Sequence, residues 1–127
     1  MATMDTEMRR MYEAVQSHLQ SLRDLQAKKT KHIESRHQLG AQKSENDLVK
    51  QELTNLEPGA QVYKLIGPAL ISQDAEDART IIEKRLEYIT GETKRVESAI
   101  DELEKREEEV RVLILQLQQQ MQQRQQA

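Results

Sequence analysis

The sequence predicts a mainly α-helical protein in which two long helices form an antiparallel coiled coil and a β-hairpin connects them. Three observations lead to this prediction. The 127 residues include only 2% aromatic residues, with no Phe or Trp, whereas a globular core relies on aromatic side chains for much of its buried area. Two charge-rich segments of similar length carry apolar residues at heptad spacing. A strand-like stretch, Val62 to Ile71, separates them.

The first helix is predicted over residues 5–57, where Pro58 and Gly59 stop it. Its heptad positions are apolar at both ends, whereas cations recur in the middle. Long cationic side chains can lay their stems on the seam and keep their charges in water. Glu107 on the second helix is a candidate partner, and Asn46 is a candidate for fixing the register. The simpler interpretation, a loosely packed middle, stays open. The recurring cations are Lys29, Arg36, Lys43 and Lys50.

The stretch between the helices is predicted to form a β-hairpin over residues 61–72, with Gly67-Pro68 as its turn. A two-stranded hairpin is marginal in water, and its outer edges are open to further strands. We therefore expect it to join a sheet made with other chains. The alternative, that it folds back onto the base of its own coiled coil, stays open. The residues assigned to the contact between chains are Val62, Tyr63, Leu65, Ile66, Ala69, Leu70 and Ile71.

The second helix is predicted over residues 74–121, followed by a frayed Gln-rich tail over residues 122–127. Asp74 is its candidate N-cap, and the acidic residues that follow suit the positive end of the helix dipole. Its seam follows strict 4-3 spacing over more than five heptads, which is typical of a coiled coil. The seam consists of Ile82, Leu86, Ile89, Thr93, Val96, Ile100, Leu103, Glu107, Val110, Ile114, Leu117 and Met121.

Both ends of the chain carry more apolar residues than one seam can bury. Val112, Leu113 and Leu115 lie outside the seam of the second helix, and Tyr12 and Leu19 lie outside that of the first. Two paired helices cannot bury apolar residues all round, so we expect exposed apolar surface here. One hypothesis is a binding surface for non-native or apolar partners. The alternative is a helix end that packs on a neighbouring chain or frays.

Several function classes find no support in the sequence. A net charge of −3 gives no electrostatic basis for nucleic-acid binding. No stretch approaches the length of a membrane span, and the N-terminus has no apolar signal region. His32 and His37 are five residues apart and do not share a helix face, so we expect no metal site. We find no phosphate loop and no catalytic constellation. The sequence therefore predicts no enzyme, no cofactor, no metal and no catalytic residue.

Three segments carry a resemblance to a known family: ENDLVKQEL (Glu45 to Leu53), VYKLIGPALI (Val62 to Ile71) and DARTIIEKRLEYI (Asp77 to Ile89). In these segments the chain resembles the beta-class subunits of prefoldin. A single hairpin between the helices matches the beta class, whereas the alpha class carries two. The resemblance implies that residues 1–127 form one prefoldin-like domain. It also implies a hetero-hexamer of two alpha-class and four beta-class subunits, whose hairpins join into intersubunit β-barrels.

The resemblance further implies an ATP-independent holding chaperone in the cytoplasm. Such a chaperone captures nascent or unfolded chains, notably actin and tubulin, and passes them to the cytosolic chaperonin. Its client contacts lie at the tips of the coiled coils. A structural scaffold or tether without chaperone activity is the alternative function. The client-binding candidates placed at the tip are Met8, Met11, Tyr12, Val15, Leu19, Leu113, Leu115 and Leu117.

Overall fold

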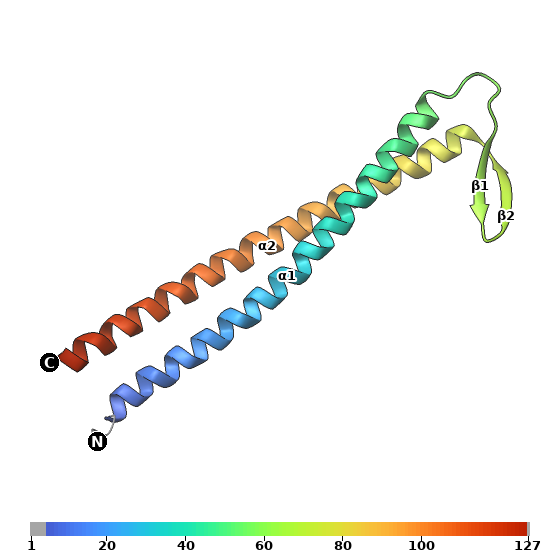
Figure 1. Cartoon of the computed structure of the whole chain (residues 1–127). Helices are drawn as coiled ribbons and strands as arrows, with labels where there is room; N and C mark the ends of the chain where they lie inside the picture. Colours follow the sequence, from blue (N-terminus) through green and yellow to red (C-terminus); the bar gives the residue numbers. More distant parts are fainter. Residues whose placement is uncertain (1–4, 127) are drawn as a thin grey trace. The chain divides into compact units, whose positions relative to one another are not determined.

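The computed structural model describes residues 5–126 and confirms the predicted fold class. Its elements follow the order α1 (Thr6–Thr54), β1 (Val62–Ile66), β2 (Ala69–Gln73) and α2 (Ala75–Gln126) (Figure 1). The two long helices are therefore joined by one antiparallel hairpin.

The chain divides into two compact units. Residues 5–34 and 97–126 belong to one, called here the terminal unit, and residues 35–96 form the other, called the hairpin unit.

Helix α1 begins at an N-cap and ends at a turn that proline and glycine impose. The Met8 N–H donates to Asp5 Oδ1 at 2.7 Å, which satisfies a free amide of the first turn. At the other end, α1 stops at Thr54 rather than at residue 57 as predicted. Pro58 disfavours helical backbone at the residue before it. Gly59 has a φ of +83°, and the Ala60 N–H donates to the Glu57 carbonyl, as in a type II turn.

The hairpin has a two-residue loop whose composition explains its geometry. Ile66 pairs with Ala69 across Gly67 and Pro68, and Val62 pairs with Gln73 at the open end. Gly67 has a φ of +56°, and Pro68 requires a negative φ. This combination is a type II′ turn, whose twist matches that of paired strands. The predicted hairpin and its turn are thus confirmed, with β2 reaching one residue further, to Gln73.

Helix α2 begins at the predicted cap. Asp74 Oδ1 accepts hydrogen bonds from the N–H groups of Glu76 at 2.7 Å and Asp77 at 3.3 Å.

The end of α2 differs from the prediction. The helix continues to Gln126, so the predicted tail over residues 122–127 is helical as far as it is described, and residue 127 lies outside the described part. Glutamine is a good helix former. In addition, Arg124 pairs with Asp5 at 3.2 Å and with Glu7 at 3.3 Å on α1, which holds the last turn of α2.

The hairpin unit has its core where the helices meet the hairpin. Leu53, Ala78 and Ile82 are buried together, and Leu56, Val62 and Leu86 pack against them. Val62 thereby ties β1 to the helices.

An arginine of α2 donates hydrogen bonds to a carbonyl oxygen at the C-terminal end of α1. Arg79 Nε and Nη2 donate to the carbonyl oxygen of Leu53, at 3.1 and 3.0 Å. The last turn of α1 has no basic residue of its own, so Arg79 supplies the positive charge that the C-terminal helix dipole favours.

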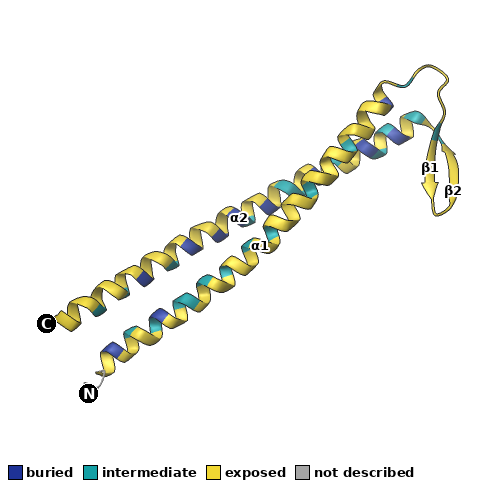
Figure 2. Ribbon diagram, viewed as in Figure 1, coloured by how far each residue is buried: buried dark blue, intermediate teal, exposed yellow. Residues whose placement is uncertain are grey.

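The terminal unit is held by one apolar stripe on each helix (Figure 2). Met8 and Val15 are buried on α1, and Ile100, Leu103 and Ile114 are buried on α2. All twelve predicted seam positions of α2, over both units, are buried or half-buried. The predicted heptad frame of α2 is therefore confirmed.

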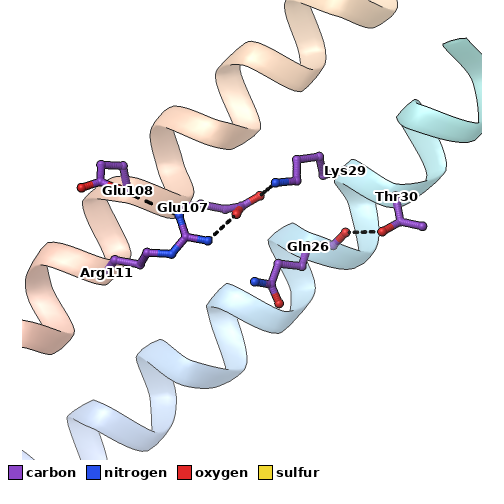
Figure 3. Close-up of polar contacts among 6 residues, drawn as sticks. All are labelled: Gln26, Lys29, Thr30, Glu107, Glu108 and Arg111. Carbon is purple, nitrogen blue, oxygen red and sulfur yellow. Dashed lines mark hydrogen bonds and ion pairs between the residues drawn. The ribbon is translucent and has the colours of Figure 1, made fainter.

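A buried carboxylate lies within this seam. Glu107 is 1% exposed, and its Oε1 is 2.9 Å from Lys29 Nζ on α1, as expected for a partner of the α1 cations (Figure 3). This contact is an ion pair without a directed hydrogen bond, because Oε1 has no partner in hydrogen-bonding geometry. The other oxygen, Oε2, accepts a hydrogen bond from Arg111 Nη2 at 3.0 Å.

The middle of α1 is loosely packed, which favours the simpler of the two interpretations. Arg36, Lys43 and Lys50 are exposed, unlike Lys29. Asn46 is half-buried, but its amide donates to the Gln42 carbonyl of its own helix at 2.7 Å. The expectation that Asn46 fixes the register is therefore wrong, because its amide is satisfied locally.

The buried charge of Glu107 makes Lys29 a test of the seam. Lys29→Met leaves the carboxylate with Arg111 alone. We expect a loss of about 2–3 kcal/mol in the free energy of unfolding of the full chain, measured by urea denaturation followed by circular dichroism. Lys29→Met combined with Glu107→Leu should recover most of this loss, because no buried charge remains.

A surface pair provides the control for this experiment. Glu102 lies 3.5 Å from Arg106, and both side chains are largely exposed. Glu102→Gln should change the free energy of unfolding by less than about 0.5 kcal/mol. Equal effects of Lys29→Met and Glu102→Gln would contradict a structural role for the buried pair.

The Asp5 cap predicts an acid-dependent loss of stability. The hydrogen bond from Met8, and then the charge of Arg124, hold the pKa of Asp5 below its ordinary value of 3.8. Because the native pKa is the lower one, stabilisation by this charge is present above 3.8 and is lost as the pH falls through the native value. Asp5→Asn should lower the Tm at neutral pH and flatten its decline in acid.

The matched variant is Glu13→Gln, which alters an exposed carboxylate of the same helix. It should leave the Tm at neutral pH unchanged. An acid decline of Tm in Asp5→Asn as steep as in the unaltered chain would refute the proposed contribution of Asp5.

Candidate interaction surfaces

The hairpin exposes apolar side chains on both of its faces. Because cross-strand partners point the same way, Tyr63, Leu65 and Leu70 share one face with Ser72. Leu65 and Leu70 are directly opposite each other, and each is 68% exposed. The second face carries Ile66, Ala69 and Ile71, which are exposed as well. Of the seven assigned hairpin residues, Val62 is the half-buried one.

Such a hairpin does not complete its own core. The two strands pair only with each other within the described residues, so each keeps an open outer edge. Apolar surface on both faces, together with two open edges, favours pairing with strands of other chains. The alternative, that the hairpin folds back onto its own helices, applies only to its open end. Val62 packs against the helix core there and its cross-strand partner Gln73 is half-buried, whereas the other residues of both strands are exposed.

The predicted client-binding residues fall into three groups by their exposure in the terminal unit. Met8 and Val15 are buried in the seam, and Met11, Leu19 and Leu117 are half-buried. The exposed residues of the set are Tyr12 at 48%, Leu113 at 43% and Leu115 at 55%. Tyr12, Leu113 and Leu115 are therefore accessible to a client, whereas Met8 and Val15 pack between the two helices.

One exposed apolar residue of the terminal unit, Val112, was not among the client-binding candidates. Val112 is exposed to the same extent as Leu113, and both line a shallow hollow on α2 with Glu108, Glu109 and Gln116. The signal was present in the sequence, since Val112 lies outside the 4-3 frame. We define Tyr12, Val112, Leu113 and Leu115 as the terminal apolar surface.

Residues 5–126 contain no group of three or more His, Asp or Glu side chains placed to hold a metal ion. Within the described residues, neither helix contains an apolar stretch of the length that a membrane span requires.

Comparison with known proteins decides the family. A model of the family described as "Prefoldin subunit" matches residues 16–126. The chain belongs to the prefoldin subunit family.

Relatives and a solved structure agree with this assignment. Prefoldin subunit 6 of Mus musculus is 41% identical over 102 residues, covering 80% of each chain. The Homo sapiens protein of the same name is also 41% identical over 102 residues, covering 80% of this chain and 79% of its own. The fold resembles the prefoldin beta subunit from Thermococcus strain KS-1, with a TM-score of 0.61 at 17% identity over 95% of this chain and 97% of that chain.

Family membership explains the incomplete hairpin. In prefoldin the β-barrel forms between subunits, so the exposed strands of this subunit find their partners in other chains. The single hairpin agrees with the beta-class resemblance, and a hetero-hexameric assembly is consistent with the family. The chain accordingly has a chaperone-type role as a prefoldin subunit, and prefoldin subunits are chaperone components rather than enzymes.

The exposed hairpin face predicts an assembly-defective variant. Leu65→Asp with Leu70→Asp places two like charges directly opposite each other on an exposed apolar face that we expect the intersubunit barrel to bury. We expect complete loss of the prefoldin complex by native mass spectrometry of the co-expressed subunits. Deleting residues 61–72 should have the same effect. As a control, Leu48→Asp alters a similarly exposed leucine outside the hairpin and should leave assembly intact. A complex that survives the paired Asp substitutions would refute the assembly role of this face.

Proposed function

We propose that this prefoldin subunit is part of an ATP-independent holding co-chaperone in the cytoplasm. Together with alpha- and beta-class subunits, it binds nascent or unfolded proteins of the actin and tubulin type. The complex then delivers them to the cytosolic chaperonin. The function of this chain within the complex is to contribute one client-binding surface at its terminal unit and one assembly surface at its hairpin.

The terminal apolar surface is the observation that carries this proposal. Its four residues lie outside the seam and are 43 to 55% exposed, so their apolar area stays in contact with water in the free chain. Unfolded chains expose apolar segments of varied sequence, and exposed apolar side chains distributed round a helix do not require a particular one. Met11, Leu19 and Leu117 are half-buried, and their accessible parts add to this apolar area. Met8 and Val15 act beneath it by holding the helices together.

Several such surfaces acting together account for holding without tight binding. Each contact is small and weak, but a client that touches several subunits is held with a combined affinity far above that of one. The client is released when its contacts with the individual subunits are replaced, one at a time, by contacts with the chaperonin. This scheme involves no nucleotide.

Polar substitution of the terminal apolar surface tests the proposal. Leu113→Ser with Leu115→Ser removes two exposed apolar side chains and no seam residue. Within the assembled complex, we expect at least a roughly twofold rise in aggregation of chemically denatured actin, measured by light scattering, because the contacts of one subunit are lost. Native mass spectrometry should show an unchanged complex.

The control variant is Leu48→Ser, which removes an exposed leucine from the hairpin unit. Suppression of aggregation by this variant should equal that of the unaltered complex. If the Leu113 and Leu115 variant also suppresses aggregation normally, the terminal apolar surface is not a client site. Failure of the unaltered complex to bind denatured protein would instead favour a structural tether.

A further inference from the structure

The hairpin unit contains a cavity beneath β1 that adjoins the exposed hairpin face and shares Tyr63 with it. Its volume is about 230 Å³, and strand β1 forms one wall. The opposite wall comes from α1 and α2, where Val49, Leu53, Ile81 and Ile82 make the lining apolar.

The charged residues of this cavity are all of one sign. Lys64 from β1 and Arg85 from α2 line it, and no Asp or Glu does. Within residues 5–126, neither Lys64 nor Arg85 has an ion-pair or side-chain hydrogen-bond partner. The neighbouring arginines differ: Arg79 donates to the Leu53 carbonyl, and Arg95 is 2.7 Å from Glu92. The cavity therefore combines an apolar wall with two free cations.

The size of the cavity restricts what it can hold. A cavity of about 150 Å³ admits a benzene ring, so this one admits a single large apolar side chain. Pockets for cofactors and drug-sized ligands are larger, at about 300–1,000 Å³. Lys64 and Arg85 are exposed, so water solvates their charges in the free chain, and they favour a negative group beside the apolar one. A protein segment that carries an apolar side chain and a carboxylate meets both requirements.

We propose that this cavity is a socket for a neighbouring prefoldin subunit, which inserts an apolar side chain and pairs a carboxylate with Arg85 and Lys64. Continuity with the assembly surface supports this occupant, because Tyr63 and Lys64 line the socket and lie on β1, the strand that joins the intersubunit barrel. The inference rests on the assembly with other subunits proposed above.

The inserted segment has a definable sequence. In an extended strand, residues i and i+2 point to the same side. A strand with Leu, Ile or Phe two positions from Asp or Glu therefore presents both groups to the socket at once. Partners that carry this pattern next to their own hairpins would be selected over those that carry Lys or Arg there, because like charges would face each other.

Charge and volume substitutions test the socket in the reconstituted complex. Arg85→Glu should weaken assembly by at least about tenfold in the concentration of half-assembly, measured by native mass spectrometry, since a charge pair is replaced by repulsion. Lys84→Glu is the matched control, because Lys84 is exposed and does not line the socket. Val49→Phe fills the socket and should also weaken assembly. Leu48→Phe, at the exposed neighbouring position, should not.

Thiol labelling identifies the occupant. The chain has no cysteine, so Ile81→Cys introduces its only thiol, and mass spectrometry can follow this peptide within the complex. Assembly with the other subunits should slow its alkylation at least about tenfold, while alkylation of Leu48→Cys stays fast. Protection that appears only when denatured client is added would overturn the proposal in favour of a client site.

The outcomes separate this inference from the proposed function. If Arg85→Glu and Val49→Phe assemble normally and the thiol of the Ile81→Cys variant stays reactive in the complex, the socket is empty and the inference is wrong, while assembly through the hairpin stands. If the Leu65 and Leu70 Asp variant also assembles normally, the assembly role itself fails. Far-ultraviolet circular dichroism of each free variant must match that of the unaltered chain, and a variant that fails this check is replaced by Arg85→Gln or Val49→Leu.

Discussion

Two paired helices can bury only one stripe of each helix, and the rest of this structure depends on that constraint. Residues such as Ile82, Val96 and Ile114 satisfy it, because each faces the seam and is nearly inaccessible. Every other apolar residue has to be covered by a different chain or left exposed. The chain leaves such uncovered apolar surface on the hairpin and on the terminal apolar surface, and also at single helix residues such as Leu48 and Tyr88. The single-stripe geometry thus leaves the hairpin exposed for pairing with other subunits and leaves a second exposed apolar surface on the terminal unit.

The buried ion pair gives the terminal unit a specificity that apolar packing lacks. Apolar seam residues accept several registers at similar cost, whereas Glu107 must be opposite a cation wherever it is buried. Lys29 provides that cation, and its 24% exposure keeps part of its hydration. Arg111 then satisfies the other carboxylate oxygen from the same helix. Charges in the seam therefore favour one alignment, in the manner of polar residues at core positions of coiled coils.

Periodicity and local chemistry predicted the features that depend on neighbouring residues. These include the seam of α2, the cap at Asp74, the turn at Gly67 and the pairing of Glu107 with an α1 cation. The predictions that proved wrong have a common cause. In each case a side chain makes a contact that the local sequence pattern does not show. Asn46 bonds to its own helix, and Arg124 holds a helix end that composition alone suggested would fray. The socket was missed because Val49, Lys64 and Arg85 belong to three elements, and only folding brings them together. Among the client-binding candidates, heptad position separates the buried Val15 from the exposed Leu113, whereas the family resemblance groups the two together because it places residues only by their position along the helices.

The hydrogen bonds from Arg79 to the Leu53 carbonyl also bear on the order of events during synthesis. The two residues are 26 positions apart, so the end of α1 gains its closing cation only after the hairpin and the first turn of α2 have left the ribosome. Until then, the emerging α1 carries exposed lysines along its middle, which keep a half-made subunit hydrated. Closure of this short loop is fast compared with translation at about 5–20 residues per second. The hairpin unit is therefore the first part of the chain able to complete its fold, and the helix ends that form the terminal unit come together last.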